Sequence, residues 1–196
     1  MIEYIKGEIK QLTPTFVVLD KSGIGFFLQI SLNTFTELQS LQECTLFVHE
    51  VIREDAYLFY GFYRTEERDA FRKLINVNGV GANTARMILS SLTVAELESC
   101  IVSENVHTLN SIKGIGLKTA QRLIVDLKDK VSRSGLSAGE PGVASAAGNQ
   151  VRQEALAALQ MLGFASSQSA KALNTVLKEF PNMPVEQVIK AALKIL

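Results

Sequence analysis

One short motif occurs twice in this chain and carries the residue types needed to bind phosphate. Residues 78–85 and 113–120 share the pattern Gly-x-Gly-x-x-Thr-Ala, so that Gly79 corresponds to Gly114. Glycine tolerates positive φ and leaves no Cβ in the path of an approaching phosphate. A helix that begins after such a turn points unpaired N–H groups and the positive end of its dipole at a ligand. The repeat therefore predicts two sites that contact a nucleic-acid backbone without reading its bases.

Side chains near the glycines extend this prediction. Lys118 and Thr119 directly follow the second turn and can add an ammonium group and a hydroxyl to the same phosphate, and Arg122 lies one turn further on. Val80 and Ile115, at the centres of the two turns, are expected to point inward and anchor each turn in the core. An ordinary αα-hairpin that uses glycine only for its turn is the structural alternative.

Two nucleotide-binding motifs are excluded by context. No predicted strand precedes either copy, which a dinucleotide-binding Rossmann motif requires. Leu117 separates Gly116 from Lys118, whereas a Walker A loop needs Gly-Lys-Ser/Thr without interruption. No carboxylate cluster, nucleophile pair or metal-ligand spacing occurs elsewhere. We therefore expect no catalytic residue, no metal, no cofactor and no nucleotide hydrolysis by this chain.

The predicted elements place both turns in a helical domain that follows a β-barrel. Five short β-rich runs and one short helix over 32–41 precede it, and they are typical of an OB-fold. These runs are 2–9, 16–19, 25–30, 46–52 and 57–62. The turn between the last two strands contains Glu54 and Asp55, for which a solvated turn is the ordinary interpretation.

From residue 65 the apolar period becomes helical. Thr65 is a candidate N-cap, Thr93 and Glu96 form a candidate capping box, and the longest helix is predicted over 117–131. Residues 132–150 are rich in Gly, Ser and Ala and are expected to be a flexible linker. Three further helices follow, and Leu162 ends the apolar face of the first. The predicted fold is an α+β multidomain chain with a barrel over 1–64, tandem hairpins over 65–131, the linker and a three-helix domain over 151–196.

Composition limits the class of protein without identifying it. The chain has 20 basic and 20 acidic residues and is 47% apolar, so it has material for real cores but no overall basic surplus. Cys44 and Cys100 are isolated, and we expect buried or incidental thiols in a reducing compartment. The first ten residues carry four charges and no long apolar run follows, so we expect no signal peptide, no membrane span and a cytoplasmic protein.

The full pattern resembles the RuvA family, the Holliday junction-binding subunits of the bacterial branch-migration complex. The resemblance is carried by the twin hairpins, by residues 53–56 followed by 58–62, and by the helix over 123–128. It covers the full length of the chain. It implies a homotetramer, with one or two tetramers per junction, that holds a four-way junction open and planar for DNA recombination and repair.

The resemblance also implies roles for individual residues. Glu54 and Asp55 would form an acidic pin at the centre of the junction, which reverses the ordinary interpretation of that turn. The C-terminal domain would dock onto the hexameric ATPase RuvB, with Leu162 and Phe164 in the apolar contact, although Leu162 is also a candidate core residue. The resolvase RuvC would be a further partner. The implied DNA-backbone residues are Gly79, Val80, Gly81, Asn83, Thr84, Gly114, Ile115, Gly116, Lys118, Thr119 and Arg122.

One departure distinguishes the two hairpins. The first carries Ala82 and Asn83 where the family commonly has Pro and Lys, so it lacks the cation that Lys118 supplies to the second. We expect a weaker grip there, dependent on backbone N–H groups, Thr84 and Arg86. Two alternatives remain open: a hairpin accessory module without junction specificity, and a protein-interaction scaffold whose hairpins are only structural.

Overall fold

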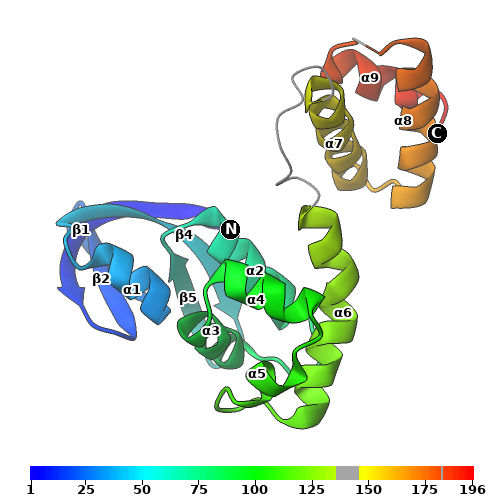
Figure 1. The fold of residues 1–196 in the computed structure, drawn as a ribbon. Helices are drawn as coiled ribbons and strands as arrows, with labels where there is room; N and C mark the ends of the chain where they lie inside the picture. The colour runs from blue at the N-terminus through cyan, green and yellow to red at the C-terminus, as the bar shows by residue number, and fades with distance from the viewer. Residues whose placement is uncertain (136–145, 182) are drawn as a thin grey trace. The chain divides into compact units, whose positions relative to one another are not determined.

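The computed structural model describes residues 1–135, 146–181 and 183–196, and the chain forms two compact units, Met1–Ser137 and Ala138–Leu196. Within the predicted linker over 132–150, one helix continues as far as Gly135 and another begins at Ala146 (Figure 1). Each residue added to an existing helix gains one backbone hydrogen bond without a new nucleation step. A helix can therefore extend beyond its last buried residue. The rest of the predicted linker lies outside the described residues.

The first unit begins with a closed five-stranded barrel, which confirms the prediction. The strands follow one another around the barrel as β1-β2-β3-β5-β4, and only the β3–β5 pair is parallel. Gly7 lets β1 cross close to β2, since a Cβ at this position would lie 2.5 Å from the Asp20 carbonyl oxygen. The strands are Tyr4–Leu12 (β1), Phe16–Lys21 (β2), Ile24–Gln29 (β3), Glu43–Ile52 (β4) and Tyr57–Phe62 (β5).

Six helices complete the first unit. The capping box of Thr93 and Glu96 is confirmed at the start of α4, where both reciprocal hydrogen bonds are present. The predicted N-cap Thr65 is wrong, because it is the first residue of α2 and its hydroxyl donates to Glu66 instead of capping the helix. The helices are Leu32–Leu38 (α1), Thr65–Ile75 (α2), Ala82–Ser91 (α3), Val94–Val102 (α4), Val106–Asn110 (α5) and Leu117–Gly135 (α6).

A second apolar core lies among α2 to α6 and reaches back to the barrel. Tyr60 and Phe62 of β5 pack against Phe71 of α2, with ring centroids 5.1 Å and 4.9 Å from its ring. The Asn33 side chain of α1 donates to the Leu89 carbonyl at 2.6 Å, which ties the barrel to α3. The barrel is therefore fixed to the helices that carry the predicted hairpins.

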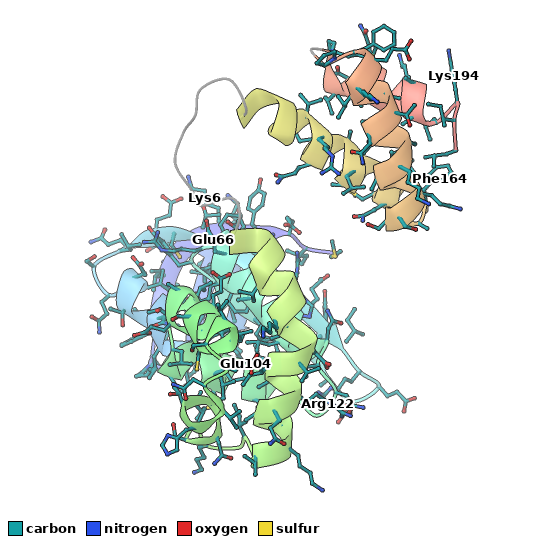
Figure 2. The ribbon with its side chains drawn as sticks, turned by 45° about the vertical axis from the view of Figure 1, so that its right-hand side comes forward. Lys6, Glu66, Glu104, Arg122, Phe164 and Lys194 are labelled. Atoms are coloured by element: carbon teal, nitrogen blue, oxygen red, sulfur yellow. The ribbon has the colours of Figure 1, made fainter. Side chains whose placement is uncertain are left out.

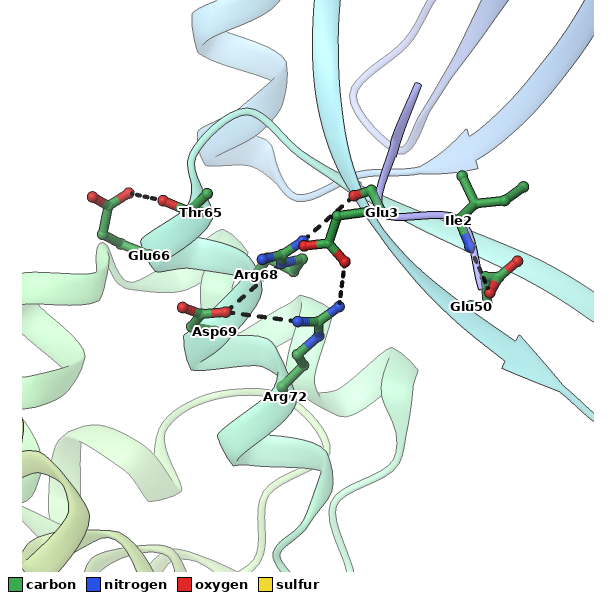
Figure 3. A network of polar contacts seen from close by, with 8 residues as sticks. All are labelled: Ile2, Glu3, Glu50, Thr65, Glu66, Arg68, Asp69 and Arg72. Carbon is green, nitrogen blue, oxygen red and sulfur yellow. Dashed lines mark hydrogen bonds and ion pairs between the residues drawn. The ribbon is translucent and has the colours of Figure 1, made fainter. Parts of the chain in front are cut away.

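Polar contacts join α2 to the start of the chain (Figure 3). Arg68 donates to the Glu3 carboxylate and lies with its guanidinium carbon 5.4 Å from the centre of the Phe47 ring. Arg72 lies 3.7 Å from the same carboxylate, and Asp69 pairs with both arginines. The Arg68 guanidinium that donates to Glu3 holds the pKa of that carboxyl below its usual range.

A buried carboxylate on the other side of α2 holds α1. Glu67 accepts hydrogen bonds from Ser31 and, at 2.7 Å, from Thr34. The Thr34 hydroxyl also accepts the Tyr63 N–H at 3.1 Å. Burial raises the pKa of Glu67 against the opposing effect of the two hydroxyl donors. Each partner of this cluster is needed, since an unsatisfied buried polar group costs free energy.

The described residues of the second unit form three helices, Ala146–Met161 (α7), Ser166–Glu179 (α8) and Val185–Ala192 (α9). Its core contains Ala155, Leu159, Leu173 and Val188. Leu162 is not a core residue: it follows α7 and is 60% exposed. In the described parts of the chain, no helix is long and apolar enough to cross a membrane.

The Glu67 cluster predicts a stability effect. Thr34→Val should lower the free energy of unfolding of the first unit by about 1–3 kcal/mol, because it leaves a buried carboxylate and a backbone N–H short of partners. All four tyrosines of the chain lie in this unit, so tyrosine fluorescence during urea unfolding follows it alone. Thr36→Val is the matched control, since the Thr36 hydroxyl is exposed and bonds only to the Leu32 carbonyl. Equal effects of the two changes would contradict this account.

Candidate nucleic-acid interface

The two repeated turns have the same backbone. In the first, the Val80 N–H donates to the Val77 carbonyl at 3.0 Å, and in the second the Ile115 N–H donates to the Ile112 carbonyl at 3.1 Å. The residue before each donor is in the left-handed region, with φ +93° at Gly79 and +91° at Gly114. The first glycine of each motif is therefore required by the reversal of the chain, since other L-residues are strained there.

The central residue of each turn points inward, as predicted. Val80 and Ile115 are both 5% exposed and belong to the same core. This burial fixes each turn against the helices on either side of it. The backbone that follows each turn is thereby held in one orientation.

The second glycine of each motif precedes a helix and leaves its start open. Gly81 is the N-cap of α3 with an extended backbone, φ −84° and ψ 170°, and no side chain caps the helix. A Cβ built at Gly81, Gly114 or Gly116 would meet no atom within 4 Å. The first N–H groups of a helix have no acceptor within it. Both helix starts thus present donors on accessible surface.

The two turns lie next to each other. A Cβ at Gly79 would be 3.9 Å from the Thr119 hydroxyl, so the first turn meets the beginning of α6. Apolar residues of both hairpins share one core. The structure therefore brings the two halves of the repeat together into one surface, which spacing along the chain did not determine.

The polar side chains at the helix starts differ between the copies. On α6, Lys118 is exposed and Thr119 is half-buried. Arg122 is exposed on the same helix (Figure 2). Asn83, at the position equivalent to Lys118, is exposed and accepts a hydrogen bond from the Tyr60 hydroxyl at 3.3 Å. Thr84 is half-buried. The second residue of the helix is therefore cationic on α6, where it is Lys118, and neutral on α3, where it is Asn83.

Arg86 is engaged with the barrel. Its guanidinium donates to the Thr15 carbonyl, in the loop between β1 and β2, at 2.9 Å. The expectation that the first hairpin draws on this cation stays a prediction.

Glu54 and Asp55 occupy the tight turn between β4 and β5. The Arg53 N–H donates to the Ala56 carbonyl at 2.8 Å and closes the turn, beyond the last strand pair, Ile52 and Tyr57. Both carboxylates are exposed. The turn thus presents two adjacent negative charges to solvent at the end of a hairpin.

Other candidate residues play no part in this surface. Cys44 and Cys100 are buried and unpaired, and burial raises the pKa of the Cys44 thiol to about 11. Burial lowers the pKa of His49, whose ring lies 5.4 Å from that of Phe71. Among the described residues, no group of three or more His, Cys, Asp or Glu side chains is arranged to hold a metal ion.

Tyr60 is the residue at this surface that the sequence did not indicate. It belongs to a β-rich run, and nothing in the local pattern places its hydroxyl beside a residue of α3. The one related signal in the sequence was Asn83 itself, which stands where the family commonly has Lys. The contact depends on how β5 packs against α3.

A closed barrel followed by two such hairpins defines a DNA-binding protein of the tandem helix-hairpin-helix class. Three family models match the chain: the RuvA N terminal domain over residues 1–61, the SAM-like helix-hairpin-helix tandem over 71–129 and the RuvA C-terminal domain over 150–196. The chain belongs to the RuvA family.

Curated relatives agree over the whole length. The protein from Bacteroides fragilis is 53% identical over 199 residues, with 99% of both chains covered. That from Parabacteroides distasonis is 52% identical and that from Azobacteroides pseudotrichonymphae 45%, each with 100% of both chains covered. All three are named Holliday junction branch migration complex subunit RuvA.

The two glycines of one turn should respond differently to the same change. Gly79→Ala places Ala at φ +93° and should lower the free energy of unfolding of the first unit by about 1–2 kcal/mol. Gly81→Ala puts a Cβ into open space at φ −84° and should cost clearly less. Urea unfolding followed by tyrosine fluorescence measures both. A larger loss for Gly81→Ala would contradict the conformational argument.

Proposed function

We propose that this protein binds four-way (Holliday) junctions through their sugar-phosphate backbones, without regard to base sequence, as a subunit of a branch-migration complex. The observation that supports this most directly is the pair of identical turns, side by side, each opening a helix start to solvent. Family membership supports the choice of junction DNA as the ligand, since the relatives are named for it.

Each hairpin binds a phosphate through backbone donors. The N–H groups at the starts of α3 and α6 and the positive ends of the helix dipoles favour an anion. Lys118 and Arg122 add charge on α6, and Thr119 and Thr84 add hydroxyls. The proposed contacts are with Gly79, Val80, Gly81, Asn83, Thr84, Gly114, Ile115, Gly116, Lys118, Thr119 and Arg122.

Preference for a junction comes from assembly. Four subunits arranged around the crossover place two hairpins on each duplex arm and gather the Glu54 and Asp55 turns at the centre. Carboxylates there repel phosphates and favour an open, planar junction whose strands separate as they enter the arms. One or two tetramers clasp each junction, and the resolvase RuvC is a further partner.

The chain itself is non-catalytic in this proposal, and the RuvB ATPase hydrolyses ATP. The second unit docks onto that motor. After α7 the chain turns at Gly163, with φ +95°, and the Phe164 N–H donates back to the Leu159 carbonyl at 3.1 Å. This cap tucks Phe164 against the core and leaves Leu162 outside. Leu162 therefore offers an exposed apolar contact, flanked by Phe164.

Gel-shift titration with a four-way junction, a duplex and a single strand tests the proposal. Tighter binding of the junction than of the duplex is the expected result. Equal affinity would favour an accessory hairpin module, and no binding would favour a protein-interaction scaffold. Mass in solution with and without junction DNA measures the assembly in the same samples.

The two hairpins should differ in their dependence on salt. Lys118→Ala should weaken junction binding more than Asn83→Ala, and it should reduce the slope of log K against log salt by about 0.9 for each phosphate that the lysine neutralises in the wild-type complex. Asn83→Ala removes no charge and should leave the slope unchanged. Titrations at several salt concentrations measure both quantities. Equally weakened binding by the two variants would refute the asymmetry.

Neutralising the acidic turn should change selectivity. Glu54→Gln combined with Asp55→Asn should tighten binding of duplex more than of junction, because it removes repulsion that a continuous duplex meets at the centre. Glu8→Gln combined with Glu43→Gln is the control for net charge, since it also removes two exposed carboxylates, on the paired strands β1 and β4. An unchanged ratio of duplex to junction affinity would count against the pin.

A further inference from the structure

The hydroxyl of Tyr60, a residue of β5, donates a hydrogen bond to a side chain of α3 at the first hairpin. Tyr60 is 2% exposed, and its ring is packed in the core against Phe71. Its hydroxyl donates to Oδ1 of Asn83, an exposed residue, at 3.3 Å. Asn83 follows Ala82, the first residue of α3, so it lies in the first turn of that helix, whose N–H groups have no acceptor within the helix.

An amide side chain has two chemically opposite ends. Oδ1 accepts hydrogen bonds and would repel a phosphate, whereas Nδ2 donates two. A hydrogen bond to Oδ1 from the protein selects the orientation in which Nδ2 is the end left for a ligand. Fixing a side chain before binding also reduces the entropy lost on binding.

The donor in this contact is held in its protonated form. Burial raises the pKa of the Tyr60 hydroxyl, against the opposing effect of the nearby Arg86 and Arg53 guanidinium groups. The hydroxyl therefore keeps its proton at neutral pH and donates it. Lys118, the equivalent residue of the second hairpin, needs no such orientation, since an ammonium group has three donors and no acceptor.

We propose that Tyr60 is a positioning residue for DNA binding, which orients the Asn83 amide so that its Nδ2 donates to a phosphate of the backbone. The first hairpin then binds by a directed neutral hydrogen bond, and the second by charge. This inference rests on the proposed function and assigns a role within it to a core tyrosine of the barrel.

A double-mutant cycle in the full-length protein tests the inference. Tyr60→Phe removes one oxygen and should weaken duplex and junction binding by about two- to tenfold, the range of one net hydrogen bond. In the Asn83→Ala background the same change should have no further effect. Neither variant should alter the salt slope, because neither removes a charge.

Rescue and spectroscopy separate positioning from a structural role. In an Asn83→Lys background, Tyr60→Phe should again cost nothing, because a cation replaces the oriented amide. A reduction of equal size in all three backgrounds would mean that Tyr60 acts only through the fold and would overturn the proposal. In the wild-type protein, the Asn83 side-chain amide NMR signals should shift on addition of duplex, and unmoved signals at saturation would also overturn it.

Failure of the broader proposal gives a different result. If the wild-type protein bound no DNA, the proposed function would be wrong and no cycle would be measurable. If it bound DNA but Tyr60→Phe had no effect in the wild-type background, only the positioning role would be wrong.

Discussion

Both hairpins hold their shape because one apolar side chain from the middle of each turn is buried in a single core. Val80 and Ile115 enter that core from two turns that are well separated in the sequence. Burial of a side chain of this size contributes about 1.5–3 kcal/mol. It acts on a turn whose reversal is permitted by glycine at positive φ. The burial of Val80 and Ile115 thus determines where the N–H groups that follow each turn lie.

Side-chain hydrogen bonds attach the first hairpin to the barrel. Asn33 donates to a carbonyl of α3, Arg86 donates to the loop after β1, and Tyr60 donates to Asn83. Helix α5 and the start of α6 rest instead on α4 and on each other. The first hairpin has Asn83 in place of a cation at the position of Lys118, and it has these additional contacts with the barrel. The two turns have the same backbone but differ in the charge beside them and in their hydrogen bonds to the barrel.

A neutral net charge is compatible with DNA binding when charges are sorted by position. Lys118 and Arg122 lie at an open helix start, while Glu54 and Asp55 lie at the end of a strand hairpin. Many other charges are paired within the protein, among them Arg68 and Arg72 with Glu3 and Asp69. The Lys128 ammonium beside Glu104 likewise holds the pKa of that carboxyl below its usual range. The net charge of the chain therefore does not determine the charge of any one of its surfaces.

The sequence by itself determined the local features of this protein. Glycine spacing predicted the two turns, short β-rich runs predicted the barrel, and helical period predicted the buried faces, because each depends on backbone conformation or on neighbours within a few residues. Tertiary structure decided what meets across long separations. It placed Gly79 beside Thr119, joined Tyr60 to Asn83, turned Arg86 towards Thr15 and left Leu162 outside the core. Such contacts depend on how whole strands and helices pack, and the local pattern of residues does not determine that packing.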